Sequence, residues 1–179
     1  VKGVINSNVQ IATNIYELKI KKSGDDSLTH FQGSPGQFYM LKGWGLDPFL
    51  SRPLSICNIS DNMLTFIYEV RGKGTKIISK LNSGDTLELL GPLGNGFDLK
   101  LEGNIAIISG GIGIAPMIYL MKELDNVDFY CGFRNEIYYA EEIEKKVKNI
   151  YITTEDGSIG HKGFVTELFI PEKYDAVLT

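Results

Sequence analysis

Residues 105–116 read IAIISGGIGIAP, an apolar run followed by a glycine-rich turn and a proline. The apolar run is typical of a strand buried on both faces of a parallel sheet. Glycines after such a strand let the backbone approach a diphosphate, and a helix starting there offers free N–H groups. Pro116 suits the first turn of that helix, where its missing N–H costs little. We therefore predict a helix from about Ala115 to Leu124, with a nucleotide beside Gly111 and Gly113.

This turn is not the common dinucleotide fingerprint, in which the glycines follow the spacing GxGxxG. A tight strand-to-helix turn that binds nothing would need similar glycines. The strand–turn–helix context favours nucleotide binding and leaves the ligand-free turn as the alternative.

Downstream of the turn, apolar runs continue to alternate with a helical pattern. Residues 137–148 are predicted to form an amphipathic helix, because opposite charges stand at i,i+4 within them. Alternating strands and helices predict a doubly wound parallel α/β sheet. Its further strands are expected at Val127–Cys131, Ile150–Thr154 and Ala176–Leu178.

Upstream of residue 100 the hydrophobic period changes to two. Apolar and polar side chains alternate over 16–21, 64–70 and 87–89, and 36–41 is a short apolar run. Turn-forming residues separate these runs, among them those at 23–26 and 61–62. Short strands joined by turns predict an antiparallel barrel or sandwich. We expect two domains, a β domain at 1–100 and an α/β domain at 101–179.

One motif in the β half is RPLSI at residues 52–56. Arg52 could hold a phosphate with its two-pronged guanidinium, and the Ser55 hydroxyl could hydrogen bond to a flavin ring. Taken alone, the motif is better explained as an edge strand in which Pro53 ends the pairing and Arg52 is solvated.

Two further segments are rich in glycine, GKGT at 72–75 and GPLGNGF at 91–97. Thr75 is predicted to be the N-cap of a helix over Lys76–Leu81, whose start would attract an anion. A capped helix after a glycine turn, and a turn that only joins two domains, are the alternatives.

Composition excludes several classes of function. The 179 residues carry 18 Lys+Arg against 22 Asp+Glu, a net charge of -4, which argues against nucleic-acid binding. No apolar run approaches the roughly 20 residues that cross a bilayer, and residues 1–4 do not resemble a signal peptide. Cys57 and Cys131 have no disulfide or metal-ligand spacing, so we expect buried thiols in a cytoplasmic protein.

The order of the motifs RPLSI, GKGT, GPLGNGF and GGIGIAP resembles that of the ferredoxin-reductase superfamily. In that family an antiparallel barrel binds FAD and an α/β domain binds NAD(P)H. PGQF at 35–38, DP at 47–48 and EDGSIGHKG at 155–163 are also similar to the electron-transfer subunit of the NAD-dependent bacterial dihydroorotate dehydrogenases. That subunit takes hydride from NADH onto FAD. It passes electrons through a [2Fe–2S] cluster to an FMN-containing catalytic partner in pyrimidine biosynthesis.

For the barrel, the resemblance implies that Arg52 contacts the FAD diphosphate and that Ser55 lies near the flavin N5. Tyr68 and Val70 would lie along the flavin, and residues 74–75 would bind the diphosphate. The FAD-binding set implied by the resemblance is Arg52, Pro53, Leu54, Ser55, Tyr68, Val70, Gly72, Gly74 and Thr75.

For the α/β half, the resemblance places Gly111, Gly113 and Pro116 on the nicotinamide-nucleotide side, with Asp156 and Gly157 lining the same cleft. No catalytic acid or base is required, because the cofactors themselves carry the hydride and one-electron chemistry.

The residues after the second α/β strand bear on the choice of dinucleotide. Arg134 could accept a 2′-phosphate, but the next charges along the chain are Glu136, Glu141 and Glu142. Acidic groups near the ribose favour a free 2′-hydroxyl, so we expect NADH to be preferred.

The family continues with a Cys-Gly-Pro segment and a cysteine cluster that this sequence lacks. Two distant cysteines cannot supply the four ligands of an iron–sulfur cluster. We therefore expect a [2Fe–2S] cluster only in the full-length protein, and an incomplete α/β domain here. An uncovered sheet edge would make that half less stable than the barrel.

Two other functions stay open on the sequence. One is a ferredoxin:NADP+ oxidoreductase-type subunit on the same scaffold, which would prefer NADPH. The other is a nucleotide-binding module without turnover, which would carry no flavin.

Overall fold

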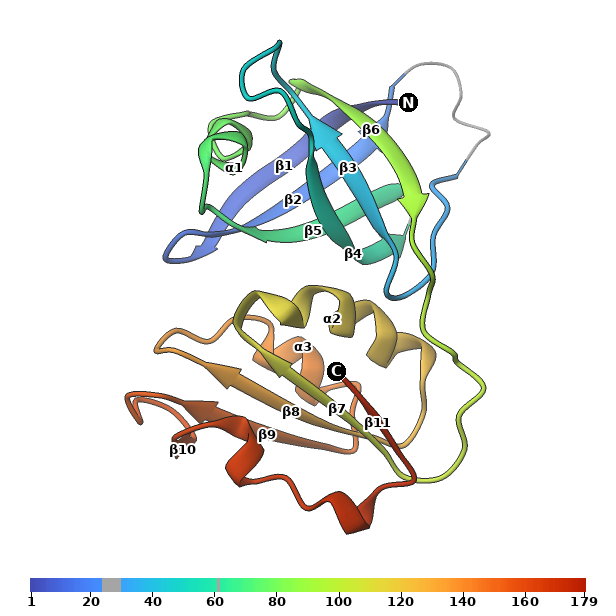
Figure 1. Ribbon diagram of the computed structural model, residues 1–179, viewed down its shortest axis with the longest axis vertical. Helices are drawn as coiled ribbons and strands as arrows, with labels where there is room; N and C mark the ends of the chain where they lie inside the picture. Colours follow the sequence, from blue (N-terminus) through green and yellow to red (C-terminus); the bar gives the residue numbers. More distant parts are fainter. Residues whose placement is uncertain (24–29, 61) are drawn as a thin grey trace. The chain divides into compact units, whose positions relative to one another are not determined.

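The computed structural model describes residues 1–23, 30–60 and 62–179. The described chain forms two compact units, Val1–Gly96 and Phe97–Thr179 (Figure 1). The first unit thus ends at residue 96, where the sequence led us to expect residue 100. The predicted turns at 23–26 and 61–62 lie partly outside the described residues, at 24–26 and 61.

The described part of the first unit is a closed antiparallel barrel with the strand order β1-β2-β5-β4-β3-β6 (Figure 1). The expected barrel is therefore confirmed. β4 pairs with both β3 and β5, so it is an interior strand, and the edge strand considered for Pro53 is wrong. The strands are β1 (Lys2–Ala12), β2 (Ile15–Lys22), β3 (Phe38–Lys42), β4 (Arg52–Ser60), β5 (Met63–Glu69) and β6 (Thr86–Leu93).

Apolar side chains from all six strands fill the barrel. Because side chains alternate across a strand, one face of each strand supplies the core. Full burial of one such side chain contributes about 1.5–3 kcal/mol. The fully buried members include Leu18, Ile20, Leu41, Ile56, Leu64 and Phe66.

Helix α1 (Lys73–Ile78) follows β5 and is attached to the barrel by the side chain of Asn8 on β1. The Asn8 Nδ2 donates to the carbonyl oxygens of Ile78 at 2.8 Å and Leu81 at 2.9 Å. Its Oδ1 accepts a 3.0 Å hydrogen bond from the buried hydroxyl of Tyr68, whose ring stacks on Tyr16. One amide thus joins β1, β5 and the end of α1.

The second unit is built on a parallel sheet with the order β10-β9-β8-β7-β11 in its described residues, as the alternating pattern predicts. The strands are β7 (Ile105–Gly110), β8 (Val127–Phe133), β9 (Asn149–Thr154), β10 (His161–Lys162) and β11 (Ala176–Leu178). The helices are α2 (Ile114–Glu123) and α3 (Ala140–Glu144), with single 3-10 turns at 111–113, 165–167 and 171–173. No helix in the described ranges has the length and apolar character to cross a membrane.

Helix α3 is shorter than the helix predicted over 137–148. Tyr139 has φ 64°, in the left-handed region, which a right-handed helix cannot contain. Tyr138 is buried, and its ring lies against Phe133 with 5.1 Å between centroids. The helix therefore begins only at Ala140.

The order in which the strands are added to the sheet reverses at β7. Strands β7, β8 and β9 step one way across the sheet, and β11 returns to the other side of β7. Open α/β sheets bind ligands at the carboxyl ends of their strands, at the point of such a reversal. In this chain that point is Gly110, the last residue of β7.

The segment between β10 and β11 covers one face of β8. The Tyr130 ring contacts Phe169 and Tyr174 with centroid distances of 5.5 and 6.0 Å. The Tyr174 hydroxyl donates to Asp128 Oδ2 at 2.7 Å and lies 2.7 Å from the Tyr130 hydroxyl. Right-handed crossovers place α2 and α3 on the opposite face.

Asn8→Ala should destabilise the barrel by about 1–3 kcal/mol, because it leaves the buried Tyr68 hydroxyl and two carbonyls without their partner. Hydrogen exchange at the β5 amides measures this loss.

Asn82→Ala is the matched control, since the exposed Asn82 side-chain amide donates a local 3.3 Å hydrogen bond to the Lys80 carbonyl. It should change the same exchange free energy by less than about 0.5 kcal/mol. Equal effects of the two substitutions would contradict the role given to Asn8.

Candidate cofactor-binding sites

The glycine turn after β7 has the geometry that the sequence predicts. Residues 111–113 form a 3-10 turn, and Gly113 is the N-cap of α2, which starts at Ile114. Gly111 has φ 51°, a conformation that glycine adopts at little cost. Pro116 lies in the first turn of α2.

Neither backbone conformation nor close packing requires glycine at position 110. Its φ of -129° and ψ of 134° suit any residue in a strand. Among the described residues, a Cβ added to Gly110, or to Gly111, would meet no atom within 4 Å other than those of its chain neighbours. The turn thus keeps open space at the end of β7, as the close approach of a ligand to the backbone requires.

The turn after β9 lies at the same edge of the sheet and carries Asp156. The backbone N–H of Glu155 donates to the carbonyls of Phe133 and Arg134, both at 3.1 Å, which ties this turn to the loop after β8. The carboxylate of Asp156 accepts hydrogen bonds from the Ser158 side chain and backbone, and these lower its pKa. An exposed, ionised Asp156 therefore stands at the edge formed by the carboxyl ends of the strands.

Helix α1 begins earlier than the sequence predicts, and Gly72 rather than Thr75 is its N-cap. The Thr75 Oγ1 accepts from the backbone N–H of Gly72 at 3.2 Å and of Arg71 at 3.1 Å. The Thr75 hydroxyl thus satisfies helix-start donors from inside the first turn, which explains the displaced boundary. A Cβ at Gly72 would also meet nothing within 4 Å.

Arg52 lies against the first turn of α1. A Cβ at Gly74 would stand 2.3 Å from Arg52 Nε and 2.9 Å from its Cγ, so only glycine leaves room for this side chain. The guanidinium is 5.9 Å from the Trp44 ring centroid, and Nη1 donates to the Ser51 carbonyl at 3.3 Å. Arg52, Gly72, Gly74 and Thr75 are therefore brought together.

The remaining predicted FAD-binding residues of the barrel, at positions 53–55, 68 and 70, differ in burial. Pro53 and Ser55 lie on the face of β4 opposite to Leu54, which is buried. Tyr68 is also buried, and its hydroxyl is bonded to Asn8. The side chains of Leu54 and Tyr68 thus belong to the barrel core. Val70 follows β5, with its N–H bonded to the Asn14 carbonyl at 2.8 Å.

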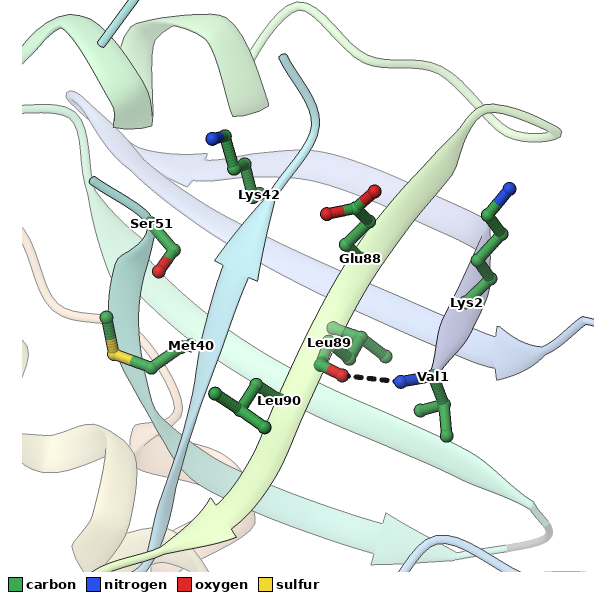
Figure 2. A pocket seen from close by; sticks show the side chains of 8 residues that line it. All are labelled: Val1, Lys2, Met40, Lys42, Ser51, Glu88, Leu89 and Leu90. Atoms are coloured by element: carbon green, nitrogen blue, oxygen red, sulfur yellow. Dashed lines mark hydrogen bonds between the residues drawn. The ribbon is translucent and has the colours of Figure 1, made fainter. Parts of the chain in front are cut away.

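An open pocket of about 450 Å³ lies on the outside of β1, β3 and β6 and contains none of the predicted site residues. Figure 2 shows the ammonium groups of Lys2 and Lys42 on either side of the Glu88 carboxylate. Met40, which lines the pocket, is the cross-strand partner of Pro53, so the pocket adjoins the outer face of β4. The full lining is Val1, Lys2, Met40, Lys42, Ser51, Glu88, Leu89 and Leu90.

Solved structures share this architecture. An NADH-dependent reduced ferredoxin-NADP oxidoreductase aligns with a TM-score of 0.82 and 27% identity, over 93% of this chain and 61% of that one. A ferredoxin NADP+ reductase from Neisseria gonorrhoeae, with bound FAD and NADP, aligns with a TM-score of 0.76 and 17% identity, over 99% and 84%. The chain thus has the fold of the ferredoxin-reductase-type oxidoreductases.

The sequence comparison narrows the class. The electron transfer subunit of dihydroorotate dehydrogenase B (NAD(+)) from Clostridium acetobutylicum is 50% identical over 177 residues, 97% of this chain and 69% of the relative. The same subunit from Clostridium perfringens is 41% identical over 184 residues, 99% and 71%. No family model matches the chain. The chain belongs to the family of these electron transfer subunits, which confirms the resemblance seen in its motifs.

Gly110→Val should weaken the binding of ADP-ribose at least about tenfold, or 1.4 kcal/mol, because the side chain fills the space that the turn keeps open. Stability should not fall, since the backbone conformation suits a β-branched residue and nothing stands near the new Cβ. Calorimetric titration and thermal unfolding give the two numbers.

Gly45→Val is the control, because a Cβ at Gly45 in the barrel unit also meets no described residue within 4 Å beyond its chain neighbours. It should leave ADP-ribose affinity unchanged. Undiminished binding by Gly110→Val would show that this space is not used by the ligand.

Proposed function

We propose that the chain binds FAD on its barrel and NADH on its α/β unit, and that it delivers electrons to a dihydroorotate dehydrogenase catalytic subunit. The 50% identity to the Clostridium acetobutylicum subunit over 97% of the chain carries this proposal. The open glycine turn and the Arg52 contact supply one feature for each cofactor.

The barrel residues fit an FAD diphosphate. Arg52 is held against Gly74 with one guanidinium N–H donated to Ser51, and its further donors suit phosphate oxygens. The Ser55 hydroxyl, on the outer face of β4 with Pro53, would hydrogen bond to the flavin ring. The bound flavin would supply the hydride-accepting and one-electron chemistry, while these residues bind and orient it.

The α/β residues fit a nicotinamide dinucleotide. Gly111 and Gly113 would let the diphosphate approach the backbone at the start of α2, with Pro116 in the turn that follows. Asp156 would line the same edge. We expect NADH to be preferred over NADPH, because Arg134 is followed by Glu136 in the exposed loop after β8.

The partner follows from the family. The relatives are named electron transfer subunits, which implies a catalytic partner. We propose that this partner contains FMN, that the two chains form a hetero-oligomer, and that they act in the cytoplasm. A [2Fe–2S] cluster would be held by residues other than those described, among which no group of three or more His, Cys, Asp or Glu could hold a metal.

A second candidate is a ferredoxin:NADP+ oxidoreductase-type subunit, which the TM-score of 0.82 to a ferredoxin-NADP oxidoreductase favours. Anaerobic titration of the purified, FAD-loaded protein separates the two. NADH should bleach the flavin absorbance at least about tenfold faster than NADPH, a difference of about 1.4 kcal/mol in barrier height. A preference for NADPH would support the second candidate, and protein unable to take up flavin would support a binding module without turnover.

Arg52→Ala should weaken FAD binding by roughly 1.5–3 kcal/mol, the scale of a hydrogen bond to a charged group. Titration of the apoprotein with FAD measures the change.

Arg71→Ala is the matched control. Arg71 also stands next to the GKGT segment, but its exposed guanidinium pairs with Glu69 at 2.7 Å. Its removal should cost less than about 1 kcal/mol of FAD affinity. If both variants lose affinity equally, the effect is one of overall charge, and Arg52 has no specific contact.

A further inference from the structure

Ser109 is the one polar side chain in the apolar run of β7, and its hydroxyl is unused. The residue is 7% exposed, and its Oγ has no hydrogen-bond partner among the described residues. A buried hydroxyl without a partner is unfavourable, because it has lost its hydrogen bonds to water and gained none in exchange. A hydrophobic or small residue would avoid this cost at the same position.

The Ser109 hydroxyl faces the glycine turn. A Cβ added to Gly113, the N-cap of α2, would lie 3.6 Å from Ser109 Oγ, and no other described side chain apart from those of its two chain neighbours would lie within 4 Å. The hydroxyl therefore lies beneath the start of a ten-residue helix, where the first N–H groups have no partner inside the helix. The free N–H groups at the start of α2 and the Ser109 hydroxyl are therefore hydrogen-bond donors that lie close together at the glycine turn.

A second buried hydroxyl without a partner lies on the other face of the sheet, away from the glycine turn. Thr153 Oγ1 on β9 is 0% exposed and likewise has no partner in the described ranges. Thr153 pairs with Gly132, and a Cβ added to Gly132 would contact Val165 in the β10–β11 segment. Thr153 therefore lies on the sheet face that this segment covers. Ser109 pairs with Cys131 and lies on the other face, under α2.

We propose that the Ser109 hydroxyl donates a hydrogen bond to a phosphate oxygen of the bound dinucleotide. This assignment rests on the proposed function and adds to it a side-chain donor for the diphosphate. Ser109 is then a binding residue that orients the dinucleotide on the turn. Its unmet donor in the free protein is satisfied by the ligand, and the α2 N-terminus contributes to the same anion.

The test compares Ser109→Ala with Thr153→Val in the FAD-loaded protein, with ADP-ribose as the probe. Both substitutions remove a buried, unpartnered hydroxyl. Ser109→Ala should weaken ADP-ribose binding at least about tenfold, as expected for a hydrogen bond to a charged group. It should also raise KM for NADH about as much with kcat within about twofold, since this contact is present before and during hydride transfer.

Thermal unfolding of the ligand-free variants supplies the independent readout. Neither variant should unfold at a lower temperature than the unsubstituted protein, because no internal hydrogen bond is removed. Thr153→Val should leave ADP-ribose affinity unchanged. Unchanged affinity in Ser109→Ala, or an equal loss in Thr153→Val, would overturn the assignment while leaving the proposed function in place. Failure of the unsubstituted protein to bind ADP-ribose would overturn both.

Discussion

The hydrogen bond from the Tyr174 hydroxyl to Asp128 connects the chain that returns to β11 with the middle strand of the α/β sheet. It holds the segment after β10 against β8, and that segment leads the chain back to β11 on the far side of β7. Only because β11 returns there does the strand order reverse at β7. The glycine turn therefore stands at the reversal point rather than in the middle of a one-directional sheet.

The barrel has an equivalent constraint in Asn8. Closure of the six strands positions β4, but closure alone does not place α1. The Asn8 amide bonds to the end of α1 and to Tyr68, which fixes the helix against the barrel. In this position the first turn of α1 packs against Arg52, and Gly74 leaves room for the Arg52 side chain. In each unit a part-buried hydrogen bond between residues far apart in the sequence thus attaches a segment outside the strands to the sheet.

Much of this could be read from the residues. Period-two alternation predicted β2 and β5, and the apolar run at 105–108 predicted β7, because burial dictates those patterns. The left-handed Tyr139 and the early start of α1 could not be read, since they depend on local backbone choices that many sequences allow. Strand β4 looked like an edge because Pro53 weakens pairing, and only closure of the barrel gives it two neighbours.

The site residues divide in the same way. Gly111 and Gly113 were predicted from their strand–turn–helix context, whereas Arg52 was predicted only from the resemblance of the RPLSI motif to the family. The burial of the Leu54 and Tyr68 side chains could not be predicted, because a motif does not state which strand face points inward. Ser109 was passed over, although a serine in an otherwise apolar strand was a usable signal.

The contact between Trp44 and Arg52 has an optical consequence. Trp44 is the single tryptophan of the chain, and its indole N–H is bonded to the Pro48 carbonyl while its ring faces the guanidinium at 5.9 Å. Its fluorescence emission therefore comes from one fixed place, beside the arginine assigned to the FAD diphosphate. The protein thus carries an intrinsic reporter there, and flavin bound beside Arg52 should quench that emission without any added label.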